Sequence, residues 1–291
     1  MAPRTHFGER LRYLRLRTGS RHSLCLASVQ PRNLLAMSLF DGLLDDEALV
    51  SHPQSQVADA LADHRELRSA YENLLASLVV RDTQLTALSR QIPTGVSVQV
   101  SVIPTGGAGG LLALAGRSIP GVDIVAAEPA LRDLDDLAGS AARVASAAAQ
   151  LVPEIDVFVG LPYGPGWQGA VELIEAAGLY GKIDTGVADS SQTLEQLSVL
   201  IEADLPFKIT NRPQSNWLTL LRAVDALIDG ASPDDAAELM GPRSHDQIGP
   251  VLAAWDEKAQ LRIRRRVRRL GTDQVRNVIN ELVAHGVLSA P

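Results

Sequence analysis

The sequence predicts an α/β fold, in the form of an incomplete or distorted (β/α) barrel with additional N-terminal and C-terminal helices. From residue 96 onward, short strand-like segments alternate with Ala- and Leu-rich helical segments, as in a parallel sheet built from βαβ units. Several of these strands carry one apolar and one polar face, whereas central strands of an open doubly wound sheet are apolar throughout. Helices outside and polar groups toward the axis or one mouth are typical of a closed barrel.

The individual elements follow from spacing and from breaker residues. Apolar residues at helical spacing predict two or three helices over residues 41–92, and Pro93-Thr94-Gly95 ends that pattern. We expect strands at residues 96–103, 122–127, 155–161, 180–185 and 206–210, with a weaker sixth signal near 267–270. Between and after them, helices are expected near residues 108–117, 131–150, 167–178, 191–203, 216–229, 233–240, 247–268 and 273–285. A full barrel needs eight strands, so we expect missing units to be replaced by helices.

Composition sets the broad class of the protein. The 291 residues are 46% apolar and 21% charged, which is close to the globular average and argues against disorder over most of the chain. No stretch of about 18 residues is both apolar and uncharged, so we expect no membrane span and a cytoplasmic location. The single Cys25 excludes an internal disulfide and any multi-cysteine metal site.

The first 36 residues are expected to be a disordered or artefactual basic extension. They carry seven Arg against one Glu and lack the apolar core of a secretory signal, and they contain Cys25, whose thiol we take to be incidental. Met37 begins a segment that suits the start of a single folded domain over residues 37–291. Within that domain we expect a helical lead-in, βα units and a mainly helical end, over residues 37–92, 93–215 and 216–291.

A second run of arginines lies near the C-terminus, at positions 262, 264, 265, 266, 268 and 269. One interpretation is a phosphate-binding stripe, but no aromatic residue interleaves with the run, as a single-strand platform requires. The pattern favours a solvated helix face paired with acids such as Asp256 and Glu257, or a contact in a homo-oligomer. Acidic residues predominate elsewhere in the domain, which disfavours nucleic acid as a partner.

Lysine is rare in this chain, and its placement predicts a site. Two of the three lysines, Lys182 and Lys208, fall inside predicted strands, where an ammonium group is costly to bury unless it is paired. In the functional interpretation, the lysine amine binds a carboxylate or phosphate as a point charge, transfers a proton or forms a Schiff base. Asp184 is then its partner or a second proton carrier. The structural interpretation, a buried Lys–Asp pair across neighbouring strands, stays open. Because barrel sites form at strand ends, we predict Lys182, Asp184 and Lys208 as catalytic residues.

Further candidates surround these lysines as ligand-binding residues: Thr105, Gly106, Gly107, Glu128, Tyr163, Thr210 and Asn211. Glu128 ends a strand and suits a proton or hydroxyl contact, or else caps a helix from Leu131. Tyr163, on the loop after a strand, suits a pocket wall or ordinary packing, and Asn211 suits an anion contact or an ordinary turn.

The glycine-rich segment Pro104–Gly110 offers a rival interpretation, a nucleotide-binding turn. The G-x-G-x-x-G pattern fails there, because counting from Gly107 the third glycine falls at Leu112. A tight turn with close helix–strand packing explains the glycines at least as well. No cofactor is assigned. The six His residues all lie away from predicted strand ends, which argues against a zinc site or a Ser-His-Asp triad there, so no metal is predicted.

Four segments together resemble an uncharacterised family of actinobacterial proteins with a barrel-like fold and no established activity. They are Pro104–Gly107, Val157–Pro162, Gly178–Gly186 and Leu205–Thr210, and the resemblance covers roughly residues 40–290. Both lysines match the family. Family members carry an acidic residue where this chain has Gly160 and a paired-His segment where it has 211–214, which implies a diverged member with altered or lost chemistry.

These observations lead to three functional hypotheses. The first is an enzyme or former enzyme, such as a lyase, aldolase or isomerase, that binds a small anionic metabolite at the C-terminal ends of the barrel strands. The second is a non-catalytic scaffold or regulatory protein that self-associates through its Ala-rich helices and the arginines at 262–269. The third is a nucleotide-binding protein that uses the Gly106–Gly110 turn.

Overall fold

The protein was analysed as a computed structural model that describes residues 39–51, 56–186, 190–210, 217–240 and 248–289. Residues 37–291 form one compact unit. The predicted basic extension, Cys25 and Asn211 lie outside the described residues.

Eight parallel strands close into a barrel, in which each strand pairs with the next and the last pairs with the first. The prediction of an α/β barrel is therefore confirmed, and the barrel is complete. The strands are β1 (Leu44–Asp46), β2 (Leu75–Arg81), β3 (Val98–Ile103), β4 (Val122–Ala127), β5 (Asp156–Gly160), β6 (Tyr180–Asp184), β7 (Phe207–Thr210) and β8 (Val267–Thr272).

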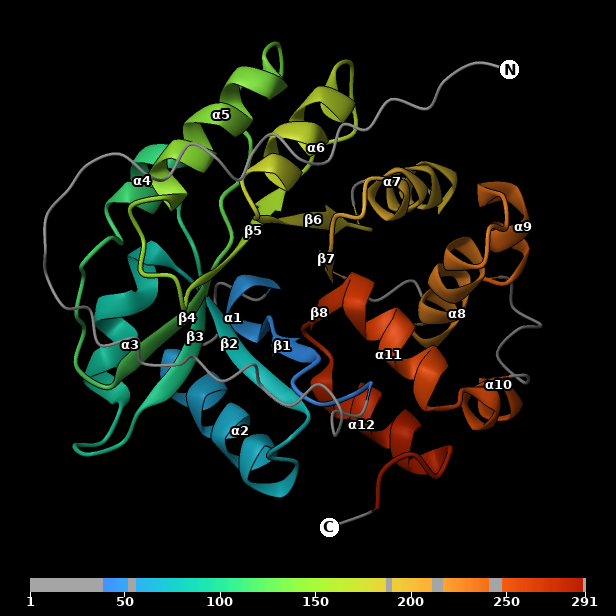
Figure 1. Ribbon diagram of the computed structural model, residues 1–291. Coiled ribbons are helices and arrows are strands. Elements are labelled where there is room, and N and C mark those ends of the chain that lie inside the picture. Colours follow the sequence, from blue (N-terminus) through green and yellow to red (C-terminus); the bar gives the residue numbers. More distant parts are fainter. Residues whose placement is uncertain (1–38, 52–55, 187–189, 211–216, 241–247, 290–291) are drawn as a thin grey trace, which may run out of the picture. The chain divides into compact units, whose positions relative to one another are not determined.

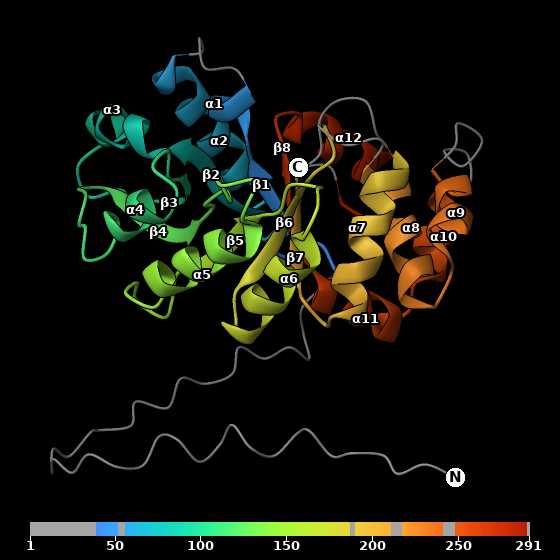
Figure 2. The same cartoon turned by 90° about the horizontal axis from the view of Figure 1, so that it is seen from above.

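Helices lie around the outside of the strands, as Figure 1 shows, and Figure 2 gives the same arrangement from above. The helices are α1 (Ala48–Ser51), α2 (Val57–Ala70), α3 (Leu85–Gln91), α4 (Ala108–Leu112), α5 (Leu137–Ala148), α6 (Trp167–Ala176), α7 (Ser190–Glu202), α8 (Trp217–Ile228), α9 (Pro233–Glu238), α10 (Ile248–Ala254), α11 (Glu257–Arg266) and α12 (Val275–Ala284). The main apolar core fills the shell between strands and helices and consists chiefly of Leu, Val and Ala.

The predicted strand count of five or six was too low because β1 and β2 fall in the segment expected to be helical. Residues 75–80 of β2 are buried on both faces, since one face lines the barrel and the other packs against helices. Such a strand shows no alternation and cannot be distinguished by periodicity from a buried helix. β1 has only three residues, which is too short to show any period.

The barrel is irregular where β2 meets β3, because their ladder begins only at Leu78 and Val100. At the start of β2, the carbonyl oxygens of Leu75 and Ala76 instead accept hydrogen bonds from Arg68 Nη1 on α2, at 3.2 and 3.1 Å. A guanidinium group thus takes the place of strand pairing at this point, because buried carbonyl groups require a donor.

The C-terminal arginine run is divided between a helix and a strand, which corrects the prediction of one solvated helix face. α11 ends at Arg266 and β8 begins at the next residue. Arg262 pairs with Asp225 and Asp229 on α8 and its C-terminal end, rather than with the acids next to it in sequence. Several of the arginines proposed for self-association therefore form ion pairs or hydrogen bonds within the chain.

Arg264 is the clearest departure from a solvated face, because it is 7% exposed. Its guanidinium donates to the carbonyl oxygens of Val267 and Arg268, at 2.7 and 2.5 Å, and to those of Asp41 and Gly42, at 3.1 and 3.3 Å. This side chain joins the segment before β1 to the start of β8, the two strands that close the barrel.

Arg264→Leu is expected to lower the free energy of unfolding by about 3 kcal/mol, because buried carbonyl groups lose their donors. Arg265→Leu is the matched control, since Arg265 is exposed, and it is expected to change stability by less than about 0.5 kcal/mol. Urea unfolding of both variants provides the measurement. Equal stabilities would show that Arg264 does not hold the barrel closed.

Candidate active site

Charged side chains meet on the barrel axis around a completely buried lysine. Lys208 Nζ lies 2.9 Å from Asp45 Oδ2, 2.8 Å from Glu128 Oε1 and 3.3 Å from Glu47 Oε1. We call these residues, together with Lys182, the lysine–carboxylate cluster.

Glu128 connects the two strand lysines that the sequence singled out. Its Oε2 lies 2.6 Å from Lys182 Nζ, while its Oε1 contacts Lys208. Lys182 and Lys208 are also register partners on the neighbouring strands β6 and β7. Both ammonium groups are therefore directed at one carboxylate inside the barrel.

Hydroxyl groups fix the orientation of each carboxylate. Ser77 Oγ donates to Asp45 Oδ1 at 2.6 Å, and Ser101 Oγ donates to Glu128 Oε1 at 2.5 Å. Thr210 Oγ1 donates to Glu47 Oε1 at 3.2 Å. Ser101 belongs to the polar face of β3, so this alternating strand does direct polar groups inward as predicted.

Strand topology explains why the cluster lies at the C-terminal mouth, the end of the barrel where the strands finish. Glu47 and Glu128 directly follow β1 and β4, and all strands are parallel, so their carboxyl ends meet at the same mouth. The Lys182 side chain is 15% exposed, whereas that of Lys208 is 0% exposed. Of the two lysines, Lys182 is thus the one accessible from solvent.

Burial and charge fix the protonation of the enclosed groups. Burial alone would lower the pKa of Lys208, but the facing carboxylates outweigh it and raise that pKa, so Lys208 stays an ammonium. Burial alone would raise the pKa of Glu128, but the two lysines hold it well below its ordinary value. Burial dominates at Glu47 and raises its pKa, which favours the neutral carboxyl group.

The remaining predicted residues have varied surroundings. Asp184 is half-buried at the end of β6, and its Oδ1 accepts from Gly186 N at 2.9 Å; the carboxylate paired with Lys182 is that of Glu128. The alternative in which Glu128 caps a helix from Leu131 is wrong, because α5 begins at Leu137. Its N-cap is Asp136, which accepts from Gly139 N.

The glycine-rich segment forms a tight turn after β3. A Cβ atom on Gly106 would lie 2.9 Å from Gly110 N, and Gly107 has a φ of 60°. Thr105 donates through its backbone N and its Oγ1 to Asp82. The observed closed barrel also differs from the open sheet that the nucleotide-binding hypothesis assumed.

Tyr163 lies on the loop after β5 and is 42% exposed. Its hydroxyl donates to Glu195 Oε2 at 2.7 Å, and its ring centroid lies 6.1 Å from that of Trp167. These contacts tie Tyr163 to α6 and α7, and they do not place it in the lysine–carboxylate cluster.

Two cluster members, Asp45 and Glu47, were missed in the sequence. The available signal was the segment Leu43–Glu47, in which acids directly follow apolar residues, but the helical spacing of its neighbours obscured it. Asp45 and Glu47 stand at alternate positions, and both contact the buried Lys208.

Within the described part of the chain, no three His, Cys, Asp or Glu side chains are arranged to hold a metal ion. None of the described helices is both long enough and apolar enough to traverse a bilayer. A scan against protein-family models and a search of curated proteins found no match to this chain.

Lys208→Met is expected to lower the free energy of unfolding by about 3–5 kcal/mol, because it removes the buried counter-charge that Asp45, Glu47 and Glu128 share. The control is Lys258→Met on α11, where the lysine is exposed and the expected change is below about 0.5 kcal/mol. Chemical unfolding of both variants tests this, and equal effects would contradict the assigned role of Lys208.

Glu47→Gln is expected to become progressively more stable relative to the parent protein as pH rises above 4.5, the ordinary pKa of this group. A carboxyl group with a raised pKa contributes stability that is fully present below its unfolded pKa and is lost as pH rises through its folded pKa. The amide does not titrate, so it avoids that loss. Unfolding free energies at several pH values, with the exposed Asp59→Asn as control, provide the measurement; a difference independent of pH would refute the assignment.

Proposed function

We propose that the protein is an enzyme that acts on a small carbonyl compound bearing a carboxylate or phosphate, with the Lys182 amine as the reacting group. The observation that carries this proposal is the Lys182–Glu128–Lys208 bridge at the C-terminal mouth of the barrel. Barrel interiors are usually filled with branched apolar side chains, and buried ion pairs are weak stabilisers of a fold. A costly charged cluster in that place is better explained by chemistry than by stability.

Accessibility and charge assign different roles to the two lysines. Lys208 is enclosed and permanently charged, so it is unsuited to attack a carbonyl carbon. Lys182 is 15% exposed, and its partner Glu128 is shared with Lys208, so Lys182 is the lysine of this bridge that a substrate can approach.

The chemistry that suits these groups is reversible imine formation. The Lys182 amine, once deprotonated, adds to the carbonyl carbon, and loss of water gives an iminium ion that withdraws electrons from the adjacent carbon. Glu128 Oε2 lies 2.6 Å from the Lys182 nitrogen and, as a carboxylate, holds that nitrogen in position, while the proton that the ammonium releases leaves with the hydroxyl group as water. Cleavage of a neighbouring carbon–carbon bond, or removal of a proton, would make the protein an aldolase-type lyase or an isomerase.

The charge at the entrance supports an anionic substrate. Of the two cluster lysines, an entering molecule meets Lys182 first, because Lys208 is enclosed. A compact ammonium group attracts carboxylates and phosphates. A substrate of this class would lose bound water and contact the Lys182 ammonium group before the amine reacts.

Borohydride trapping tests the proposal directly, because the chain contains only three lysines. The full-length protein is incubated with pyruvate or with dihydroxyacetone phosphate, reduced, digested and mapped by mass spectrometry. We expect a covalent adduct on the peptide that contains Lys182, because reduction converts the imine to a stable amine.

Two arginine variants provide the controls for this experiment. Lys182→Arg is expected to abolish the adduct, and Lys258→Arg, on the exposed face of α11, is expected to retain it. An adduct that forms equally on Lys258, or none with either carbonyl compound, would contradict the proposed chemistry.

A further inference from the structure

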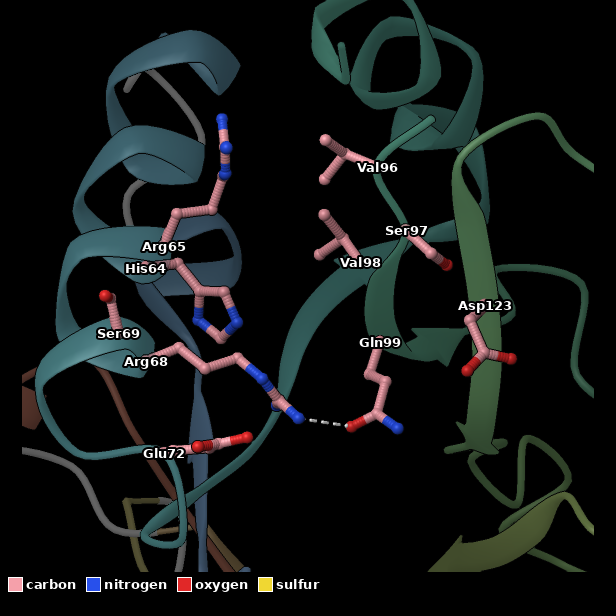
Figure 3. A pocket seen from close by; sticks show the side chains of 10 residues that line it. All are labelled: His64, Arg65, Arg68, Ser69, Glu72, Val96, Ser97, Val98, Gln99 and Asp123. Atoms are coloured by element: carbon pink, nitrogen blue, oxygen red, sulfur yellow. Dashed lines mark hydrogen bonds between the residues drawn. The ribbon is translucent and has the colours of Figure 1, made fainter. Parts of the chain in front are cut away.

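A groove lies where β3 and β4 begin, and its lining shares no residue with the lysine–carboxylate cluster. It has a volume of about 560 Å³ and lies between α2 and the beginnings of β3 and β4. Figure 3 shows the side chains that line it, from α2 on one wall and from β3 and β4 on the other. The groove borders the place where β2 and β3 are not yet paired and Arg68 replaces the ladder.

His64 gives this groove a buried and unsatisfied polar atom. The residue is 1% exposed, and its Nδ1 lies 3.0 Å from Asp46 Oδ2. Its Nε2 has no hydrogen-bond partner among the described residues, which is uncommon for a buried ring nitrogen. Figure 3 shows the ring projecting from α2 into the space that faces Val98.

The contact with Asp46 determines what Nε2 can bind. A carboxylate accepts hydrogen bonds only, so Nδ1 carries a proton, and in the tautomer with its single proton on Nδ1 the Nε2 atom is an acceptor. In that tautomer the missing partner is a group with an N–H or O–H donor.

Positively and negatively charged side chains line different parts of the groove. Arg65 on α2 lies toward one end, and Glu72, in the turn after α2 ends at Ala70, lies toward the other. Asp123 on β4 adds a second carboxylate on the opposite wall. Arg68 is already occupied by two carbonyl oxygens and by Gln99 Oε1 at 2.8 Å.

We propose that this groove binds a small dipolar molecule with an ammonium group and a carboxylate several bonds apart, of the class of dipeptides and ω-amino acids. Its carboxylate pairs with Arg65, and its ammonium group lies toward Glu72 and Asp123. An N–H donor of the ligand satisfies His64 Nε2. An extended dipeptide holds its two charges roughly 7 Å apart and so suits opposite charges at different ends of a groove, whereas the charges of a single α-amino acid lie only a few bonds apart.

The experiment uses the full-length protein with ¹⁵N-labelled histidine side chains, and glycylglycine as the probe. The His64 signals are assigned by their loss in His64→Gln. Addition of glycylglycine is expected to change the nitrogen shift of His64 Nε2 in a saturable manner. Glycine, which is shorter, and N-acetylglycinamide, which carries no charge, are expected to bind more weakly or not at all.

Variants of the exposed charges make the proposal falsifiable without disturbing the fold. Arg65→Ala and Glu72→Gln are each expected to weaken glycylglycine binding about two- to fivefold, the effect of one exposed ion pair. Arg90→Ala, an exposed arginine on α3 that does not line the groove, is expected to leave binding unchanged. Absence of a saturable shift, or a shift that persists unchanged in both groove variants, would overturn the proposal.

Discussion

The neutralisation of Lys208 is the constraint on which the barrel depends. A fully buried ammonium group on β7 requires carboxylates close by, and they come from β1 and from the end of β4, remote from it in sequence. Removing either kind of partner leaves an uncompensated charge in the interior. The cluster also fixes register, because a shift of one residue in β7 would turn Lys208 outward into the apolar shell and Ile209 toward the axis. The paired charges thus favour one register of the strands, which the hydrophobic pattern alone would specify less strongly.

The molecule separates its apolar core from its buried charged groups in space. Apolar burial is concentrated in the shell between strands and helices, where small aliphatic side chains such as Ala141, Ala170 and Val144 allow close packing. The axis, which many barrels fill with apolar layers, holds acids, lysines and hydroxyl groups. This division is consistent with a chain that contains only 4% aromatic residues, because a thin shell packs well with small groups. The axis holds groups whose burial costs stability unless they are paired.

The sequence was informative where a strand had two unlike faces. β3 and β6 alternate because one face is polar and lines the axis, and those strands were predicted close to their observed bounds. β2 is apolar on both faces, so its spacing imitates a helix. Lys182 and Lys208 were found because lysine is rare here, whereas Asp45 and Glu47 are common residue types in an acidic chain. Arg264 was taken for a surface cation because its partners are carbonyl groups, which leave no mark in a sequence.

β1 joins the two proposed sites, although it has only three residues. Its consecutive acids are both buried and point to opposite sides: Asp45 contacts Lys208 on the axis, and Asp46 contacts His64 on α2. Each carboxylate needs a hydrogen-bond donor on its own side, since burial without one is costly. Asp46 also accepts from Ala48 N, which ties it to the start of α1. The short strand therefore supplies one buried carboxylate to the groove side and one to the axis.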